Sequence, residues 1–127
     1  MQITDDPGAS PNAISAYETG LVRMQDRVYR ASLIVTREKL IEHWNPPSID
    51  RLMIDDFAGL LALAPQVVIL GTGPSQRLPP AELFAAFAAH GIGLEVMDTG
   101  AACRTYNLLL SEYRDVALAL IFDGAGS

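Results

Sequence analysis

The sequence predicts one α/β domain in which a β-meander precedes a β-α-β-α-β unit, which is half of a doubly wound fold. Its 127 residues are 50% hydrophobic and 19% charged, which is enough apolar side chain for one sizeable core. The hydrophobic pattern also changes along the chain, from alternation in the first part to apolar runs separated by helical stripes in the second. We therefore expect a single domain over residues 16–123, with flexible tails over residues 1–15 and 124–127.

The first part of the domain is predicted to be a β-meander. Residues 17–24 and 28–36 are rich in β-branched and aromatic side chains, and the second run alternates with period two. The segment Gln25-Asp26-Arg27 is a plausible hairpin turn between them. Residues 39–44 form a third short strand in this interpretation. Asn45-Pro46-Pro47 ends that strand, because proline cannot donate to a ladder.

The second part is predicted to alternate helices and buried strands. The expected elements are a short helix after Asp55-Asp56, a strand over 67–70, a helix opened by Pro79-Pro80, a strand over 94–97, a helix over 100–113 capped by Asp98-Thr99, and a strand over 116–122. Right-handed crossovers would put strand 67–70 between the other two and place the two connecting helices on opposite faces. The carboxyl end of that strand is then a topological switch point, where open α/β sheets leave a crevice.

Composition argues against several classes of partner. The chain has nine Lys and Arg against fifteen Asp and Glu, a net charge of −6, which gives no drive toward nucleic acid or anionic lipid. No apolar run approaches the roughly 20 residues of a membrane span, so membrane insertion is not expected. A single cysteine and an N-terminus without signal-peptide features favour a reducing, cytoplasmic location.

The loop after strand 67–70 is the main candidate for ligand binding. Its glycines allow unusual backbone angles and expose N–H groups, its hydroxyls add hydrogen-bonding capacity, and its arginine adds a cation. The third glycine of a dinucleotide fingerprint is replaced by Gln76, so no cofactor is expected, and a plain tight turn is the competing interpretation. The predicted small-molecule or anion site comprises Gly71, Thr72, Gly73, Ser75, Arg77, Asp98, Thr99 and Asn107.

The remaining reactive side chains do not form a catalytic or metal-binding set. His43 and His90 lack second ligands at metal spacing, so no metal is expected. Cys103 lies on an apolar helical stripe and is expected to be buried. Asn107 lies in mid-helix, where it is expected either to fasten the loop after the glycine turn or to face solvent.

Several segments together carry a resemblance to a known family: residues 67–73 (Val-Val-Ile-Leu-Gly-Thr-Gly), 90–92 (His-Gly-Ile), 95–99 (Glu-Val-Met-Asp-Thr) and 101–107 (Ala-Ala-Cys-Arg-Thr-Tyr-Asn). In these the chain resembles the small Mth-type domain family of uncharacterised function. That family includes a mitochondrial assembly factor for respiratory complex I and an adipogenesis-associated protein. The resemblance implies a three-layer α/β fold with a mixed central sheet and an extra β layer. It implies no established catalytic residue or cofactor.

The function expected from these observations is a non-enzymatic protein-binding or assembly module. Its partner would bind an exposed apolar face of the meander formed by Tyr17, Tyr29, Ile41 and Trp44, unless these side chains simply cap the core. The alternative function is binding of a small molecule or anion at the Gly71-Thr72-Gly73 crevice. A nucleotide-dependent enzyme is the third possibility.

Overall fold

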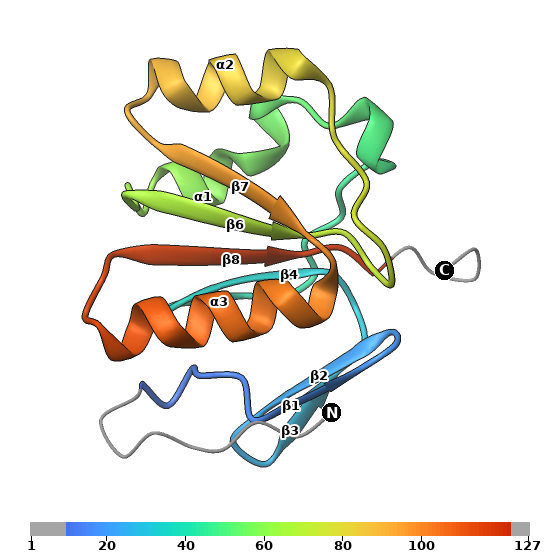
Figure 1. Ribbon diagram of the computed structural model, residues 1–127, viewed down its shortest axis with the longest axis vertical. Helices are drawn as coiled ribbons and strands as arrows, with labels where there is room; N and C mark the ends of the chain where they lie inside the picture. The colour runs from blue at the N-terminus through green and yellow to red at the C-terminus, as the bar shows by residue number, and fades with distance from the viewer. Residues whose placement is uncertain (1–9, 123–127) are drawn as a thin grey trace.

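A five-stranded mixed sheet forms the centre of the computed structural model, which describes residues 10–122 (Figure 1). Its strands lie in the order β5 (Leu40–Ile41), β4 (Leu33–Thr36), β8 (Val116–Leu120), β6 (Val67–Gly71) and β7 (Gly93–Met97). Strand β6 is parallel to both β7 and β8, whereas β4 is antiparallel to β8 and β5. The predicted position of β6 between the other two parallel strands is confirmed.

Two helices connect the parallel strands and cover opposite faces of the sheet, as predicted. Helix α2 (Ala81–Ala89) joins β6 to β7, and helix α3 (Thr99–Ser111) joins β7 to β8 (Figure 1). Val68 packs with Phe87 of α2 in one buried cluster, and Ile69 packs with Tyr106 of α3 in the other. Successive residues of β6 thus enter different cores, which is why the whole strand is apolar.

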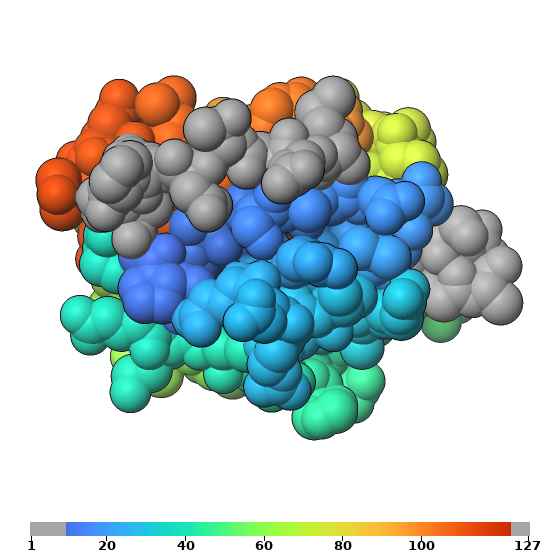
Figure 2. Space-filling model, turned by 90° about the horizontal axis from the view of Figure 1, so that it is seen from below, coloured from blue at the N-terminus to red at the C-terminus, as the bar shows by residue number. Residues whose placement is uncertain are grey.

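The meander is present as a separate layer, but the strands that form it differ from the predicted ones. Strands β1 (Ala16–Glu18), β2 (Leu21–Met24) and β3 (Arg27–Tyr29) form an antiparallel sheet on the far side of α3 (Figures 1 and 2). Each expected long strand is split, and β4 and β5 belong to the main sheet. The physical reason is that three successive side chains of β4 are buried, which requires a strand covered on both faces.

The segment between β5 and β6 fills one core with aromatic side chains. It contains the 3₁₀ turns η1 (Ile49–Arg51) and η2 (Ile54–Phe57) and the single turn α1 (Ala58–Leu61), where a short helix was predicted. The Phe57 ring lies 5.2 Å from that of Trp44 and 5.0 Å from that of Phe87, measured between centroids. Trp44 Nε1 donates to the Asp56 carbonyl at 2.8 Å. The strand predicted over 39–44 is therefore only two residues long, because Trp44 turns into this core.

The described part of the expected N-terminal tail, residues 10–15, is packed against the domain. The Ile14 side chain is only 1% exposed and belongs to the core beneath α3. Residues 1–9 and 123–127, which include the expected C-terminal tail, lie outside the described residues. Within residues 10–122, no helix is both long and apolar enough to cross a membrane.

Candidate binding cleft

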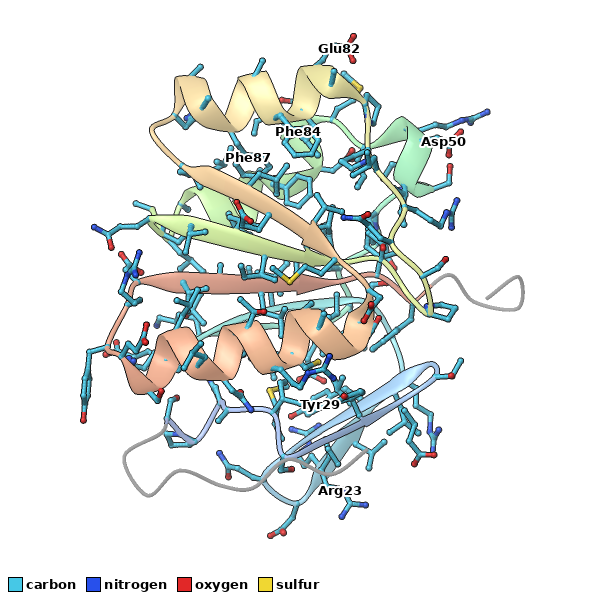
Figure 3. All side chains as sticks on the ribbon, viewed as in Figure 1. Arg23, Tyr29, Asp50, Glu82, Phe84 and Phe87 are labelled. Atoms are coloured by element: carbon cyan, nitrogen blue, oxygen red, sulfur yellow. The ribbon has the colours of Figure 1, made fainter. Side chains whose placement is uncertain are left out.

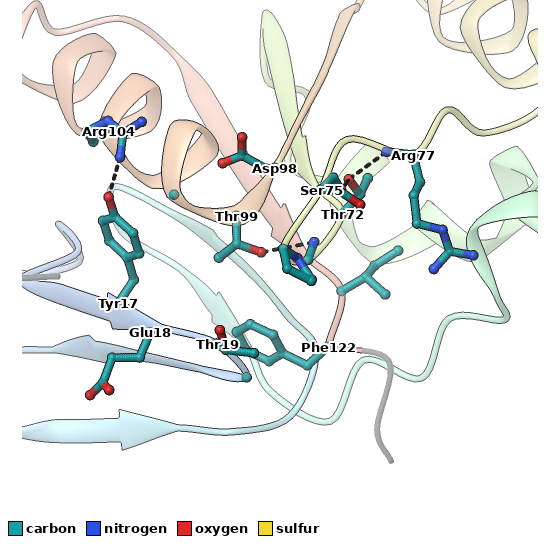
Figure 4. Close-up of a pocket in the computed structure, with 15 residues that line it drawn as sticks. Tyr17, Glu18, Thr19, Thr72, Ser75, Arg77, Asp98, Thr99, Arg104 and Phe122 are labelled. Atoms are coloured by element: carbon teal, nitrogen blue, oxygen red, sulfur yellow. Dashed lines mark hydrogen bonds between the residues drawn. The ribbon is translucent and has the colours of Figure 1, made fainter. Parts of the chain in front are cut away.

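A cleft of about 600 Å³ lies where the carboxyl ends of the central strands meet the β1–β2 hairpin (Figure 4). One wall is the loop after β6, another is the start of α3, and a third is the hairpin. The lining comprises Tyr17, Glu18, Thr19, Gly20, Thr72, Gly73, Pro74, Ser75, Arg77, Asp98, Thr99, Gly100, Arg104, Ile121 and Phe122. The cleft therefore occupies the predicted switch point, with an added wall that comes from the meander.

Close packing at the end of β6 requires glycine. A Cβ atom on Gly71 would lie 2.6 Å from Leu120 Cδ2, which is closer than real Cβ atoms come, and 3.1 Å from the Ala102 methyl group, which is tighter than most such contacts. Gly73 adopts φ +97°, a conformation that favours glycine. The two glycines thus let the chain pass closely over α3 and then turn.

The glycine loop is fastened by its own side-chain hydrogen bonds. Thr72 Oγ1 donates to the Ser75 carbonyl at 2.8 Å and accepts from the Arg77 N–H at 3.0 Å. The Gly73 N–H donates to Thr99 Oγ1 at 3.0 Å, and the Thr99 N–H donates to the Gly73 carbonyl at 2.8 Å. The Gly73 amide is therefore directed to Thr99 inside the protein rather than to a ligand in the cleft.

The start of α3 is capped by a carboxylate. Asp98 is the N-cap, as predicted, and its Oδ1 accepts from the Ala101 N–H at 2.8 Å. The negative charge lies at the positive end of the helix dipole. A ligand in the cleft consequently meets a carboxylate at the position where an anion-binding helix would present free amides.

The hairpin wall is joined to α3 by a contact that the sequence analysis did not predict. The Tyr17 ring lies across Gly100, where an added Cβ would be 2.8 Å from Tyr17 Cε1. The Arg104 guanidinium donates to the Tyr17 hydroxyl and stands 5.8 Å from the ring centroid (Figure 4). Gly100 and Arg104 are four residues apart and share one helix face, but only the tertiary fold brings Tyr17 to them.

Most of the residues predicted for ligand binding do converge. Thr72, Gly73, Ser75, Arg77, Asp98 and Thr99 line the cleft, and Gly71, the last residue of β6, directly precedes Thr72 in the chain. Asn107 does not belong to this group and does not fasten the glycine loop. Its Oδ1 accepts from the Ile14 N–H at 2.9 Å and its Nδ2 donates to the Ile14 carbonyl at 2.8 Å, so it holds the segment that leads into β1.

The apolar face predicted for partner binding is absent as a single surface. Trp44 is buried, and Ile41 packs against the same core. Tyr17 and Tyr29 are half-buried against the other core, on the opposite side of the main sheet. The expectation failed because β5 and the meander belong to different sheets. Only Tyr17 lines the cleft.

The buried titratable groups lie outside the cleft. Burial raises the pKa of the Cys103 thiol to about 12 and also raises the pKa of Tyr106. The expected burial of Cys103 is confirmed. Across the part of the chain that the structure describes, no three His, Cys, Asp or Glu residues are grouped so as to hold a metal ion.

Known proteins resemble this chain over two thirds of its length or more. A Francisella tularensis protein named 13 kDa major membrane protein is 28% identical over 122 residues, covering 95% of this chain and 99% of that one. The NADH dehydrogenase [ubiquinone] 1 alpha subcomplex assembly factor 3 of Danio rerio is 39% identical over 89 residues, covering 68% of this chain. The match spans 51% of that assembly factor, about half its length.

Solved structures confirm the fold. The solution structure of a Bordetella pertussis protein, described as a Mth938-like domain, has a TM-score of 0.76 and 29% identity, covering 98% of this chain and 94% of that one. The resemblance to Mth-type domains and to a complex I assembly factor is thus confirmed. The family described as "Protein of unknown function (DUF498/DUF598)" matches residues 14–121, and the chain belongs to that family.

Proposed function

We propose that the chain is a protein-binding module that assists the assembly of a multi-subunit complex and holds a segment of its client in the cleft. The observation that carries this proposal is the make-up of the cleft. Its walls come from two separate layers, and its lining combines carboxylates, guanidinium groups, hydroxyls and two aromatic rings (Figure 4). A protein segment can match such a mixed surface, because its backbone and side chains offer donors, acceptors, charges of both signs and apolar groups together.

The relatives support the same class of function. The Danio rerio relative is named as an assembly factor for NADH dehydrogenase, and its match with this chain includes more than two thirds of the chain. In this proposal the chain would assist assembly by holding another protein. We therefore propose a client that belongs to a respiratory or other membrane-associated complex.

Site-specific crosslinking in the native host tests the proposal. A photo-crosslinking residue placed at Thr19, on the exposed hairpin rim of the cleft, is expected to capture a defined client. The same residue placed at Glu112, at the other end of α3, serves as the control and is expected to capture far less of it. Equal capture from both positions, or no client from either, contradicts the proposal.

A matched pair of charge reversals connects the cleft to assembly. Glu18 and Glu112 are both exposed, but only Glu18 lines the cleft. We expect Glu18→Lys to reduce the amount of assembled complex in cells and Glu112→Lys to leave it unchanged. If deletion of the whole chain leaves the assembly and activity of complex I and of the other membrane-associated complexes unchanged, the assembly role is refuted.

A small anion is the second candidate ligand, because two guanidinium groups, those of Arg77 and Arg104, line the cleft. The nearby Asp98 and Glu18 carboxylates and the internally bonded Gly73 amide make an anion a poorer fit than a protein segment. Titration with phosphate or sulfate, followed by amide NMR, tests this candidate. Amide shifts confined to residues 72–77 and 98–101 would favour it over the client-binding proposal.

A further inference from the structure

The outer edge of the central sheet at β7 has backbone groups that none of the described strands satisfies. Strand β7 pairs only with β6 among the described strands and lies at the end of the five-stranded order (Figure 1). The Gly93 N–H donates to the Gln66 carbonyl, and the Met97 carbonyl accepts from the Thr72 N–H, so both face β6. Because the N–H and C=O groups of successive residues in a strand point to opposite sides, those of Leu94 and Val96 point away from β6.

Among the residues that the structure describes, one of these outward groups has a hydrogen-bond partner and the others have none. Gln76 Nε2 donates to the Val96 carbonyl at 2.9 Å, beside the carboxyl end of the strand. Within residues 10–122, the N–H groups of Leu94 and Val96 and the Leu94 carbonyl have no hydrogen-bond partner. Two donors and one acceptor therefore stand in a row along the edge, which is the pattern that an added strand pairs with.

The side chain at the centre of this edge restricts what can pair with it. Glu95 is exposed and lies between the two outward-facing residues. If a second copy of the chain paired β7 with β7 in the antiparallel register that matches Leu94 to Val96, the two Glu95 side chains would stand directly opposite each other. Like charges in that position destabilise a strand pair. A basic side chain opposite Glu95 would instead stabilise one.

We propose that β7 accepts an extended segment of the client as an added strand, with Lys or Arg opposite Glu95. This inference rests on the proposed function, since it specifies how a client is held. It concerns a second surface, because neither Leu94 nor Glu95 lines the cleft. Main-chain hydrogen bonds to Leu94 and Val96 would supply most of the recognition, and the charge opposite Glu95 would supply selectivity.

Selection from a library of short random peptides displayed on phage, with the full chain as target, tests the edge directly. We expect the selected peptides to be extended apolar sequences that contain Lys or Arg. On binding, the Leu94 and Val96 amides are expected to shift in NMR spectra and to exchange more slowly. The variant Glu95→Lys should bind those peptides at least about fivefold more weakly, from the loss of one cross-strand charge pair and its replacement by repulsion.

The variant Glu82→Lys is the matched control, because it makes the same charge change at an exposed site on α2 (Figure 3). Glu82→Lys should leave peptide affinity unchanged. A second selection that uses the Glu95→Lys variant as its target should enrich acidic peptides instead of basic ones. The inference is overturned if no peptides are selected, if Glu82→Lys and Glu95→Lys act alike, or if the amides that respond lie elsewhere. A client crosslinked through Thr19 whose complex leaves the Leu94 and Val96 amides unprotected would refute the edge inference and leave the proposed function standing.

Discussion

Replacing Asn107 by alanine is expected to destabilise the domain by releasing the segment that leads into the cleft wall. The Asn107 side chain satisfies both backbone polar groups of Ile14, through bonds of 2.9 Å and 2.8 Å. Each partner left unsatisfied near a buried residue costs about 1–2 kcal/mol. Alanine stabilises the folded helix by roughly 0.5 kcal/mol relative to asparagine, because its helix propensity is higher. The free energy of unfolding should therefore fall by about 1.5–3.5 kcal/mol.

Urea unfolding followed by circular dichroism measures this loss. Leu108→Ala, at a 56% exposed position next to Asn107 on the same helix, is the control and should change the free energy of unfolding by less than about 0.5 kcal/mol. Hydrogen exchange gives a second measurement, since the Ile14 amide should exchange faster in Asn107→Ala. The reasoning is refuted if both variants lose the same stability, or if the Ile14 amide remains as protected as in the wild type.

Three further predictions address the glycines and the buried thiol. Gly71→Ala should lower the free energy of unfolding by about 1–3 kcal/mol, because its Cβ would lie 2.6 Å from Leu120. Gly93→Ala should lower it little, because its Cβ would lie 3.8 Å from the nearest atom, Val67 Cγ2; equal losses would contradict the packing argument. Gly100→Ala should push the Tyr17 ring away from α3, because the added Cβ would lie 2.8 Å from Tyr17 Cε1. Amide hydrogen exchange should then become faster in β1 and stay the same in β6. An unchanged exchange rate in β1 would count against the contact. The pKa of the Cys103 thiol is about 12 in the folded state and about 8.5 in the unfolded state, so between these pH values the unfolded state loses the thiol proton and the folded state retains it. Thermal stability should therefore fall as pH rises from about 8.5 to about 12, and more steeply than in Cys103→Ala. Rapid thiol labelling at neutral pH would refute the burial of Cys103.

Local patterns in the sequence were sufficient to predict the β-α-β-α-β unit and part of the cleft lining. The apolar run before Gly71 predicts a strand buried on both faces, and the structure places its successive residues in two different cores. The Asp98 cap was predictable because the side chain bonds an amide only three residues away. The convergence of the glycine loop with the start of α3 followed from the crossover rule, which limits three parallel strands to few arrangements.

The tertiary structure alone decided which strands pair and which distant side chains meet. Strand β4 continues the same alternating run as β3, yet it pairs with β8 because its apolar side chains on both faces need cover. Tyr17 meets Arg104 across 87 residues, and Asn107 meets Ile14 across 93 residues. Periodicity reports which face of an element is apolar, but it carries no information about which other element will cover that face. The hairpin wall of the cleft and the role of Asn107 therefore depend on the packing of separate layers, which the free energy of the whole fold determines.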